Sequence, residues 1–198
     1  MPRRPRTADL LSALAGVLRR RRVRWYVFGA QAVLVHGRPR LTEDVDVTVE
    51  TDAAGVNSLV AALRRAGFAP RVSDVAGFVA RARVIPFLHR KTGIPLDLVV
   101  AGSGLEQEFL ARAVVVDVGG IRVPVMAPDD LVITKVIAGR DKDIEDASGI
   151  LAAQGDRLDV KRVRSVLGEV DAALGDTDMV GRFDRLRSSR RRPRRRER

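Results

Sequence analysis

The stretch that decides the fold runs from Trp25 to Glu50 and reads WYVFGAQAVLVHGRPRLTEDVDVTVE. Its first four residues are a β-prone apolar run that stops at Gly29, and residues 30–36 follow as a short apolar helix ended by Gly37. From residue 44 to residue 50, valine alternates with polar residues at the period of two that a strand requires. The stretch therefore predicts a strand, a glycine turn, a helix and a second strand.

Two carboxylates stand on the second of these strands. Asp44 and Asp46 are two residues apart and share one face, whereas the valines that alternate with them share the other. Carboxylates placed in this way can chelate Mg²⁺, which prefers hard oxygen ligands and keeps sites for water and phosphate. An exposed strand face is often polar, however, so this pair alone also fits a purely structural interpretation.

A third carboxylate favours the functional interpretation. Asp97 lies within the apolar run Ile94–Val100, which is predicted as a strand that forms a hairpin with residues 82–89. An ionised carboxylate in such a run is costly unless it is paired, hydrogen-bonded or bound to a metal ion. Three carboxylates on two strands, next to a glycine turn, therefore indicate a metal-dependent site.

The composition limits what such a site can contain. The 198 residues include no cysteine and two histidines, so the ligands must be carboxylates rather than thiolates or a histidine cluster. No apolar run approaches the roughly 20 residues that cross a bilayer, and no apolar segment of a secretory signal follows the Arg-rich start. We therefore expect a cytoplasmic protein without a membrane partner.

The net charge of +11 is concentrated at the two ends of the chain. Residues 1–24 carry +7 and residues 182–198 carry +8, so the residues between them carry −4. Strongly basic ends attract polyanions, and nucleic acid is the natural candidate. The alternative for the C-terminal end is a solvated, disordered terminus with no specific ligand.

The remaining elements are predicted from hydrophobic period and capping residues. They are a helix that begins at Thr7 and is closed by Arg19–Arg22, a helix at 56–66, a helix at 104–113 capped by Ser103, and a hairpin at 114–118 and 121–125. After Pro128 the pattern is helical, at 131–138, 142–153 and 160–174. We therefore predict an α/β core at 1–127, a helical extension at 128–186 and a basic, disordered tail at 187–198.

Several short motifs follow one another in an order that resembles the minimal nucleotidyltransferase superfamily. This is the fold shared with the DNA polymerase β palm, and the motifs resemble in particular the toxin-type nucleotidyltransferases of abortive-infection AbiEii systems. The motifs are Gly29-Ala30-Gln31-Ala32, His36-Gly37, Arg40, Thr42, Asp44-Val45-Asp46, Leu96-Asp97-Leu98, Asp129-Asp130-Leu131, Lys135, Ala138, Arg140, Lys142-Asp143 and Asp146. The resemblance covers about residues 24–150 and implies an α+β fold, with a mixed β-sheet flanked by helices and a C-terminal helical extension.

The resemblance also implies a site for a nucleoside triphosphate (NTP) and for Mg²⁺ or Mn²⁺. Backbone amides at Gly29 and Ala30 would bind the triphosphate at the start of the helix, with Arg40 and Thr42 in the same nucleotide site. The metal ligands would be Asp44, Asp46 and Asp97, of which Asp97 would also help to deprotonate the attacking hydroxyl. The family usually has Ser or Gly where this chain has Ala30, so one hydroxyl contact to phosphate is missing while the backbone donors remain.

Further roles fall on the helical extension. Lys135 would neutralise phosphate charge, and Asp143 would orient Lys135 or Arg140. In the simpler alternative, Lys135 is a surface cation. The other structural alternatives are helical surface pairs of Asp143 with Lys142 and of Asp146 with Arg140, and a pair of Arg40 with Glu43.

The resulting prediction is an enzyme that transfers a nucleoside monophosphate (NMP) from an NTP to a hydroxyl, with release of pyrophosphate. The acceptor would be RNA, such as a tRNA end, or a protein side chain, and the enzyme would act as the toxin of a pair with an antitoxin protein. One alternative is a catalytically degenerate nucleotidyltransferase fold that acts as a nucleic-acid-binding or regulatory module. Another is an enzyme that modifies a small molecule, as antibiotic nucleotidyltransferases do.

Overall fold

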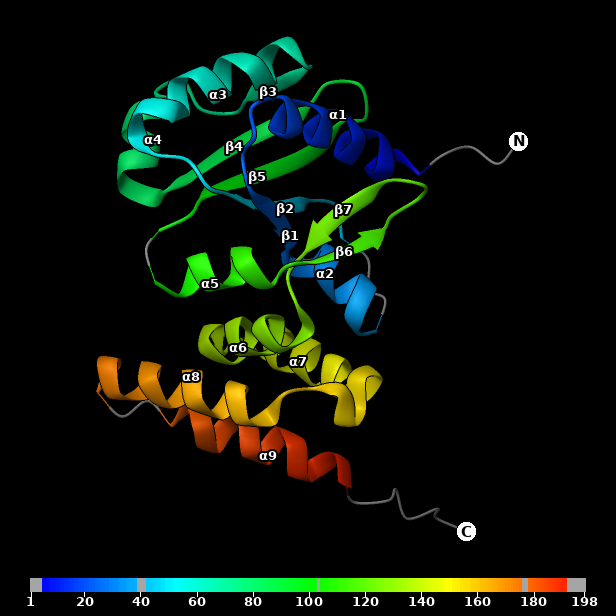
Figure 1. Ribbon diagram of the computed structural model, residues 1–198, viewed down its shortest axis with the longest axis vertical. Helices are drawn as coiled ribbons and strands as arrows, with labels where there is room; N and C mark the ends of the chain where they lie inside the picture. Colours follow the sequence, from blue (N-terminus) through cyan, green and yellow to red (C-terminus); the bar gives the residue numbers. More distant parts are fainter. Residues whose placement is uncertain (1–4, 39–41, 103, 176–177, 192–198) are drawn as a thin grey trace. The chain divides into compact units, whose positions relative to one another are not determined.

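The computed structural model describes residues 5–38, 42–102, 104–175 and 178–191 (Figure 1). The chain forms two compact units. One consists of Met1–Ala32 with Leu41–Ala127, and the other consists of Val33–Arg40 with Pro128–Arg198. One boundary between these units lies after Ala127, where the predicted α/β core also ends. The predicted division into three domains stays a prediction.

A mixed β-sheet is the basis of the first unit. In the described residues it has seven strands, in the order β3-β4-β5-β2-β1-β7-β6. Their bounds are β1 Trp25–Phe28, β2 Val45–Val49, β3 Phe68–Pro70, β4 Val84–His89, β5 Ile94–Val100, β6 Val114–Asp117 and β7 Arg122–Val125. The pairs β2/β5 and β1/β7 are parallel, and the other pairs are antiparallel. This mixed α+β architecture confirms the predicted fold class.

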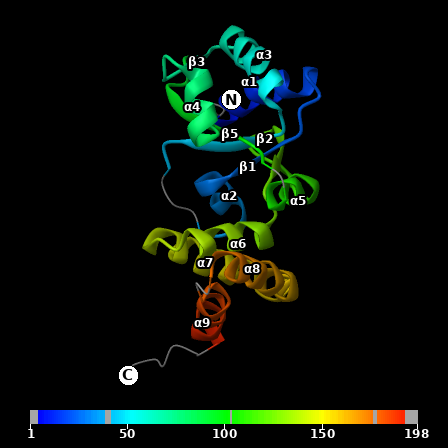
Figure 2. The ribbon, with the colours of Figure 1, turned by 90° about the vertical axis from the view of Figure 1, so that its left-hand side faces the viewer.

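Helices cover both faces of this sheet. They are α1 Arg6–Arg20, α3 Ala53–Arg65, α4 Val75–Ala82 and α5 Leu105–Arg112, and α2 Gly29–His36 begins in the first unit and ends in the second. Figures 1 and 2 show α1 and α3 on one side of the sheet and α5 on the other. Val45, Val47 and Val49 are fully buried with the leucines of β5, because the period of two places them all on one apolar face.

Four helices form the second unit together with residues 33–38. They are α6 Pro128–Ala138, α7 Asp141–Gln154, α8 Val160–Leu174 and α9 Met179–Arg191, with a 3₁₀ turn at Gly155–Arg157 between α7 and α8. The fully buried carboxylate of Asp130 on α6 accepts two hydrogen bonds from Arg162 on α8, at 3.0 and 3.1 Å. No helix in the described part of the chain is long and apolar enough to cross a membrane.

Several helix starts differ from the prediction, one of them because a side chain caps the helix at another position. The first helix begins at Arg6, and Thr7 lies inside it rather than at its cap. The helix predicted at 56–66 begins at Ala53, since the carboxylate of Asp52 accepts a hydrogen bond from the backbone of Gly55. The predicted cap Ser103 lies outside the described residues, and Gly104 precedes the helix.

Three elements were not predicted. β3 and α4 lie in a segment, residues 68–82, whose sequence shows little periodicity, and α4 is capped by Asp74. The third is α9, which includes residues 187–191 of the predicted disordered tail, so that part of the prediction was wrong. The carboxylate of Asp171 accepts hydrogen bonds from the first backbone amides of α9, which a reading of local sequence does not show. Residues 192–198 lie outside the described residues.

Candidate active site

Asp46 and Asp97 are direct neighbours across two parallel strands. The register of β2 and β5 pairs Asp46 with Asp97, and the register of β1 and β2 pairs Phe28 with Asp46. Paired residues project from the same face of a sheet, so both carboxylates lie on the face opposite to the buried valines. Because Gly29 follows Phe28, the glycine turn begins beside the same row of residues.

Gly29 makes room for the carboxylate of Asp46. Its φ of +62° lies in the left-handed region that favours glycine. A Cβ at this position would overlap the Asp46 carboxylate, so the side chain of Asp46 packs directly against the Gly29 backbone. Ala30, the next residue, is 5% exposed. The glycine turn and the candidate metal ligand Asp46 are therefore in direct contact.

Asp44 lies one residue before β2 and is exposed. Its carboxylate accepts a hydrogen bond of 2.7 Å from the hydroxyl of Thr42. Its backbone oxygen accepts a hydrogen bond of 3.4 Å from the side chain of Gln31 on α2. Thr42, predicted to lie in the nucleotide site, thus holds a carboxylate in place, while Arg40 lies outside the described residues.

Asp97 carries the clearest sign of a missing partner. Its Oδ1 atom is buried and has no hydrogen-bond partner among the described residues. Burial raises the pKa of Asp97, the charge of Arg71 opposes this effect, and the charge of Asp44 adds to it. A buried carboxylate oxygen of this kind is stabilised by a cation, and a hard divalent ion fits an all-oxygen set of donors. Among the described residues, no three His, Cys, Asp or Glu side chains are already arranged as a metal site.

Arg71 is a cation near this site that the sequence analysis did not identify. Its backbone amide donates a hydrogen bond of 2.8 Å to the oxygen of Pro86, and Pro86 pairs with Asp97 in the sheet. Arg71 therefore lies at the end of the same row, on the other side of Asp97 from Asp46. Nothing in the local sequence marks it, because its position depends on the pairing of β3 with β4.

The residues predicted on the helical extension form a buried ionic cluster in the second unit. Lys135 is 8% exposed, and its Nζ atom lies 2.8 Å from an oxygen of Asp143 and 2.8 Å from an oxygen of Asp146. Arg140 Nε donates to the other oxygen of Asp143 at 2.5 Å. The predicted contacts of Asp143 with Lys135 and Arg140 are present. Lys135 is not a surface cation, and neither aspartate is a surface residue.

The charge balance of this cluster explains its burial. Burial opposes ionisation of Asp143, but hydrogen bonds from Arg140 and Lys135 outweigh it and hold the pKa of this carboxyl below its ordinary value. The two carboxylates and two cations leave no net charge. The cluster joins α6 to α7, and the role of Lys135 toward phosphate remains a prediction.

A model of the family described as nucleotidyltransferase of unknown function (DUF6036) matches residues 9–190. The chain belongs to this nucleotidyltransferase family. A search of curated protein sequences found no match.

Solved structures of nucleotidyltransferases share the fold. The crystal structure of ANT(2")-Ia in complex with adenylyl-2"-tobramycin is 13% identical, with a TM-score of 0.61 over 86% of this chain and 100% of that one. An antigenic nucleotidyltransferase-like protein from Paracoccidioides brasiliensis is 16% identical, with a TM-score of 0.53 over 89% and 91%. The lincomycin-bound lincosamide antibiotic adenylyltransferase LnuA is 14% identical, with a TM-score of 0.50 over 71% and 93%.

At these identities the likeness shows the nucleotidyltransferase fold and nothing about substrates. Family and fold together confirm the predicted nucleotidyltransferase superfamily and support NMP transfer as its general activity. The acceptor, the metal dependence and the narrower resemblance to toxin-type enzymes remain predictions.

Proposed function

We propose that this chain is a metal-dependent nucleotidyltransferase that transfers NMP from an NTP to a hydroxyl of RNA. The observation that carries the proposal is the pairing of Asp46 with Asp97 beside the Gly29 turn, with one buried oxygen of Asp97 lacking a partner. The basic ends of the chain favour RNA over a small molecule as the acceptor. A toxin role, with an antitoxin partner, would follow from the narrower resemblance.

The row of residues across the sheet suggests how the two substrates would lie. At one end, backbone amides at Gly29 and Ala30 would hold the triphosphate near the start of α2. In the middle, Asp44, Asp46 and Asp97 would hold Mg²⁺ or Mn²⁺, which would neutralise phosphate charge and activate the attacking hydroxyl. At the other end, Arg71 is suited to a phosphate of the acceptor.

The chemical step needs little from the protein beyond this placement. The hydroxyl oxygen of the acceptor forms a bond to the α-phosphorus as the bond from that phosphorus to the bridging oxygen breaks. Asp97, on the acceptor side of the row, would accept the hydroxyl proton, and pyrophosphate would leave toward the Gly29 turn.

Incubation with each α-labelled NTP, Mg²⁺ and total RNA or total protein tests the proposal. We expect label in RNA, and a loss of roughly 100-fold or more in Asp46→Asn and Asp97→Asn, because each change removes a charged oxygen ligand. The exposed Asp156→Asn serves as a matched control and should retain full activity. The Asp97→Asn variant should unfold no more easily than wild type, since it replaces a buried carboxylate that lacks a partner.

Other outcomes would overturn parts of the proposal. Normal transfer by Asp97→Asn would remove Asp97 from the site. Label in protein instead of RNA would change the acceptor. A folded wild-type protein that transfers no label but binds RNA would favour the alternative of a degenerate, nucleic-acid-binding module.

A further inference from the structure

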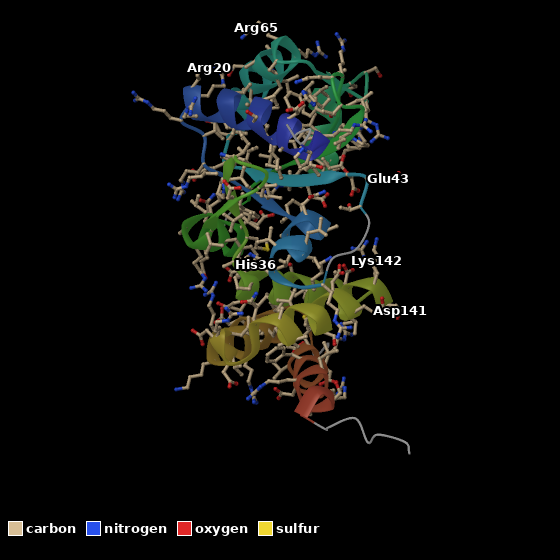
Figure 3. The ribbon with its side chains drawn as sticks, turned by 90° about the vertical axis from the view of Figure 1, so that its right-hand side faces the viewer. Arg20, His36, Glu43, Arg65, Asp141 and Lys142 are labelled. Carbon is tan, nitrogen blue, oxygen red and sulfur yellow. The ribbon has the colours of Figure 1, made fainter. Side chains whose placement is uncertain are left out.

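A hollow of about 310 Å³ opens between the C-terminal ends of α1 and α3. Its lining residues are Val17, Arg20, Arg21, Ala62, Arg65 and Ala66. Figure 3 shows Arg20 and Arg65 at the adjoining ends of these two helices. Three guanidinium groups from two helices therefore surround one space, although Arg65 is 44 positions away from Arg21 in the sequence.

The charge around this hollow is not neutralised by the protein. Six exposed arginines lie at or directly after the ends of the two helices, three of them in the lining of the hollow, and among the described residues none forms an ion pair: Arg19, Arg20, Arg21, Arg22, Arg64 and Arg65. The acidic residue of α1 is Asp9, in its first turn, and α3 contains none. The helix dipoles contribute only about half a negative charge each at these ends. Six nearby positive charges repel one another, so a bound anion would lower their energy.

Arg24 shows the contrasting case in the same segment of the chain. Its guanidinium forms two hydrogen bonds of 2.6 Å with the carboxylate of Glu50, and each partner shifts the pKa of the other toward the ionised form. Arg24 is thus neutralised within the protein, whereas the three arginines that line the hollow form no ion pair among the described residues. Arg21 contacts the hydroxyl of Ser58, which orients it without changing its charge.

The hollow is separate from the candidate active site. Asp46 and Asp97 lie on the face of the sheet where α2 begins, as the contact between Gly29 and Asp46 shows. The helices α1 and α3 lie on the other side of the sheet in Figures 1 and 2. An anion in the hollow would therefore not touch the reacting groups.

We propose that this hollow binds the phosphate backbone of RNA and docks the acceptor at a distance from the reacting carboxylates. The planar guanidinium fork suits phosphate, and the three positive charges in the lining exceed what one backbone phosphate neutralises. The lining includes no aromatic residue on which a base could stack, so the contacts are to the backbone and independent of sequence. Docking of the acceptor rests on the proposed function, whereas RNA binding at the hollow does not.

RNA binding by the full chain, measured without NTP by fluorescence anisotropy, tests this site. The double variant Arg20→Gln/Arg65→Gln should bind a labelled single-stranded RNA about 10-fold more weakly. Its plot of log affinity against log salt should be less steep by about 1.4, since each lost phosphate contact on a single strand removes about 0.7. The control Arg90→Gln/Arg122→Gln removes the same charge from exposed positions elsewhere in the unit and should change affinity less than about twofold.

The remaining outcomes separate this inference from its alternatives. Equal losses in the two double variants would overturn it in favour of diffuse charge attraction. Binding of inorganic phosphate at low concentration that is lost in Arg20→Gln/Arg65→Gln, together with no RNA binding, would replace RNA by a free anion. A wild-type protein that binds RNA at the hollow but transfers no NMP would overturn the proposed function alone. Circular dichroism spectra must match wild type for each variant.

Discussion

Gly29 shows at the scale of one residue how backbone conformation and chemistry are linked in this site. Its left-handed φ and its contact with Asp46 both exclude a side chain. Gly29→Ala should abolish most NMP transfer, because the new methyl group would displace the Asp46 carboxylate. The expected loss of unfolding free energy is about 1–2 kcal/mol for the backbone alone, plus the cost of the overlap. Transfer of label and chemical denaturation measure the two effects.

Gly67→Ala separates these two causes. Gly67 has a φ of +90°, but a Cβ there would meet no atom within 4 Å. This variant should lose about 1 kcal/mol of stability and keep its activity. If Gly29→Ala also kept its activity, the Gly29 turn would not be part of the active site.

At the scale of secondary-structure elements, the ion pairs of Lys135 hold α6 against α7. Lys135→Met would leave the buried carboxylates of Asp143 and Asp146 with too little positive charge. We expect a loss of about 3–5 kcal/mol in unfolding free energy, the usual cost of removing one partner of a buried ion pair. The exposed Lys142→Met on α7 is the matched control and should stay within about 0.5 kcal/mol of wild type. A stable but inactive Lys135→Met would instead assign Lys135 to phosphate binding.

The hairpin of β4 and β5 should make stability depend on pH through His89. This residue is 2% exposed, its Nδ1 atom lies 2.9 Å from the hydroxyl of Thr92, and its ring stacks on Phe68 at 4.6 Å. Burial lowers the pKa of His89, and the charge of Lys91 lowers it further. The unfolded chain therefore takes up a proton near pH 6.5 that the folded protein takes up only at lower pH, so stability falls as the pH drops below about 6.5.

Urea denaturation at about pH 7.5 and about pH 5.5 measures this effect. The loss of unfolding free energy on going from the higher to the lower pH should be smaller in His89→Gln than in wild type, by up to about 1.4 kcal/mol. Glu50 and Asp143, whose pKa values are lowered, lose their contributions only at more acidic pH. An equal loss in both proteins would show that His89 titrates normally in the folded state.

At the scale of the whole molecule, ligand binding should raise the stability of the native chain. An NTP with Mg²⁺ that binds only the folded protein contributes about 2.7 kcal/mol at 100 times its dissociation constant. We expect a higher Tm for wild type with both ligands, no increase after chelation of the metal, and no increase for Asp46→Asn. An increase with NTP alone, unchanged by a chelator, would argue against metal-dependent binding.

Local pattern was enough to predict much of the fold. The strand, turn and helix from Trp25 to His36, the hairpin around Gly119-Gly120 and the helix Val160–Leu174 follow from periods of 2 and 3.6 and from glycine turns. The local pattern did not predict the short elements β3 and α4. It also did not predict the polar helix α9, because this helix depends on the distant cap Asp171 and on the burial of Phe183. Local signals encode an element only when its own residues stabilise it.

The sequence by itself determined the candidate metal ligands: Asp44 and Asp46 share the polar face of an alternating strand, and Asp97 interrupts an apolar run, where an ionised carboxylate is costly unless it is paired or bound to a metal ion. Only the tertiary structure decided that Asp46 pairs with Asp97, that Arg71 ends their row, and that the arginines of α1 and α3 surround one hollow. The physical reason is that strand order and helix packing depend on burying apolar surfaces from distant parts of the chain. A period of two assigns a side chain to a face of a strand, but it does not assign the strand its neighbour.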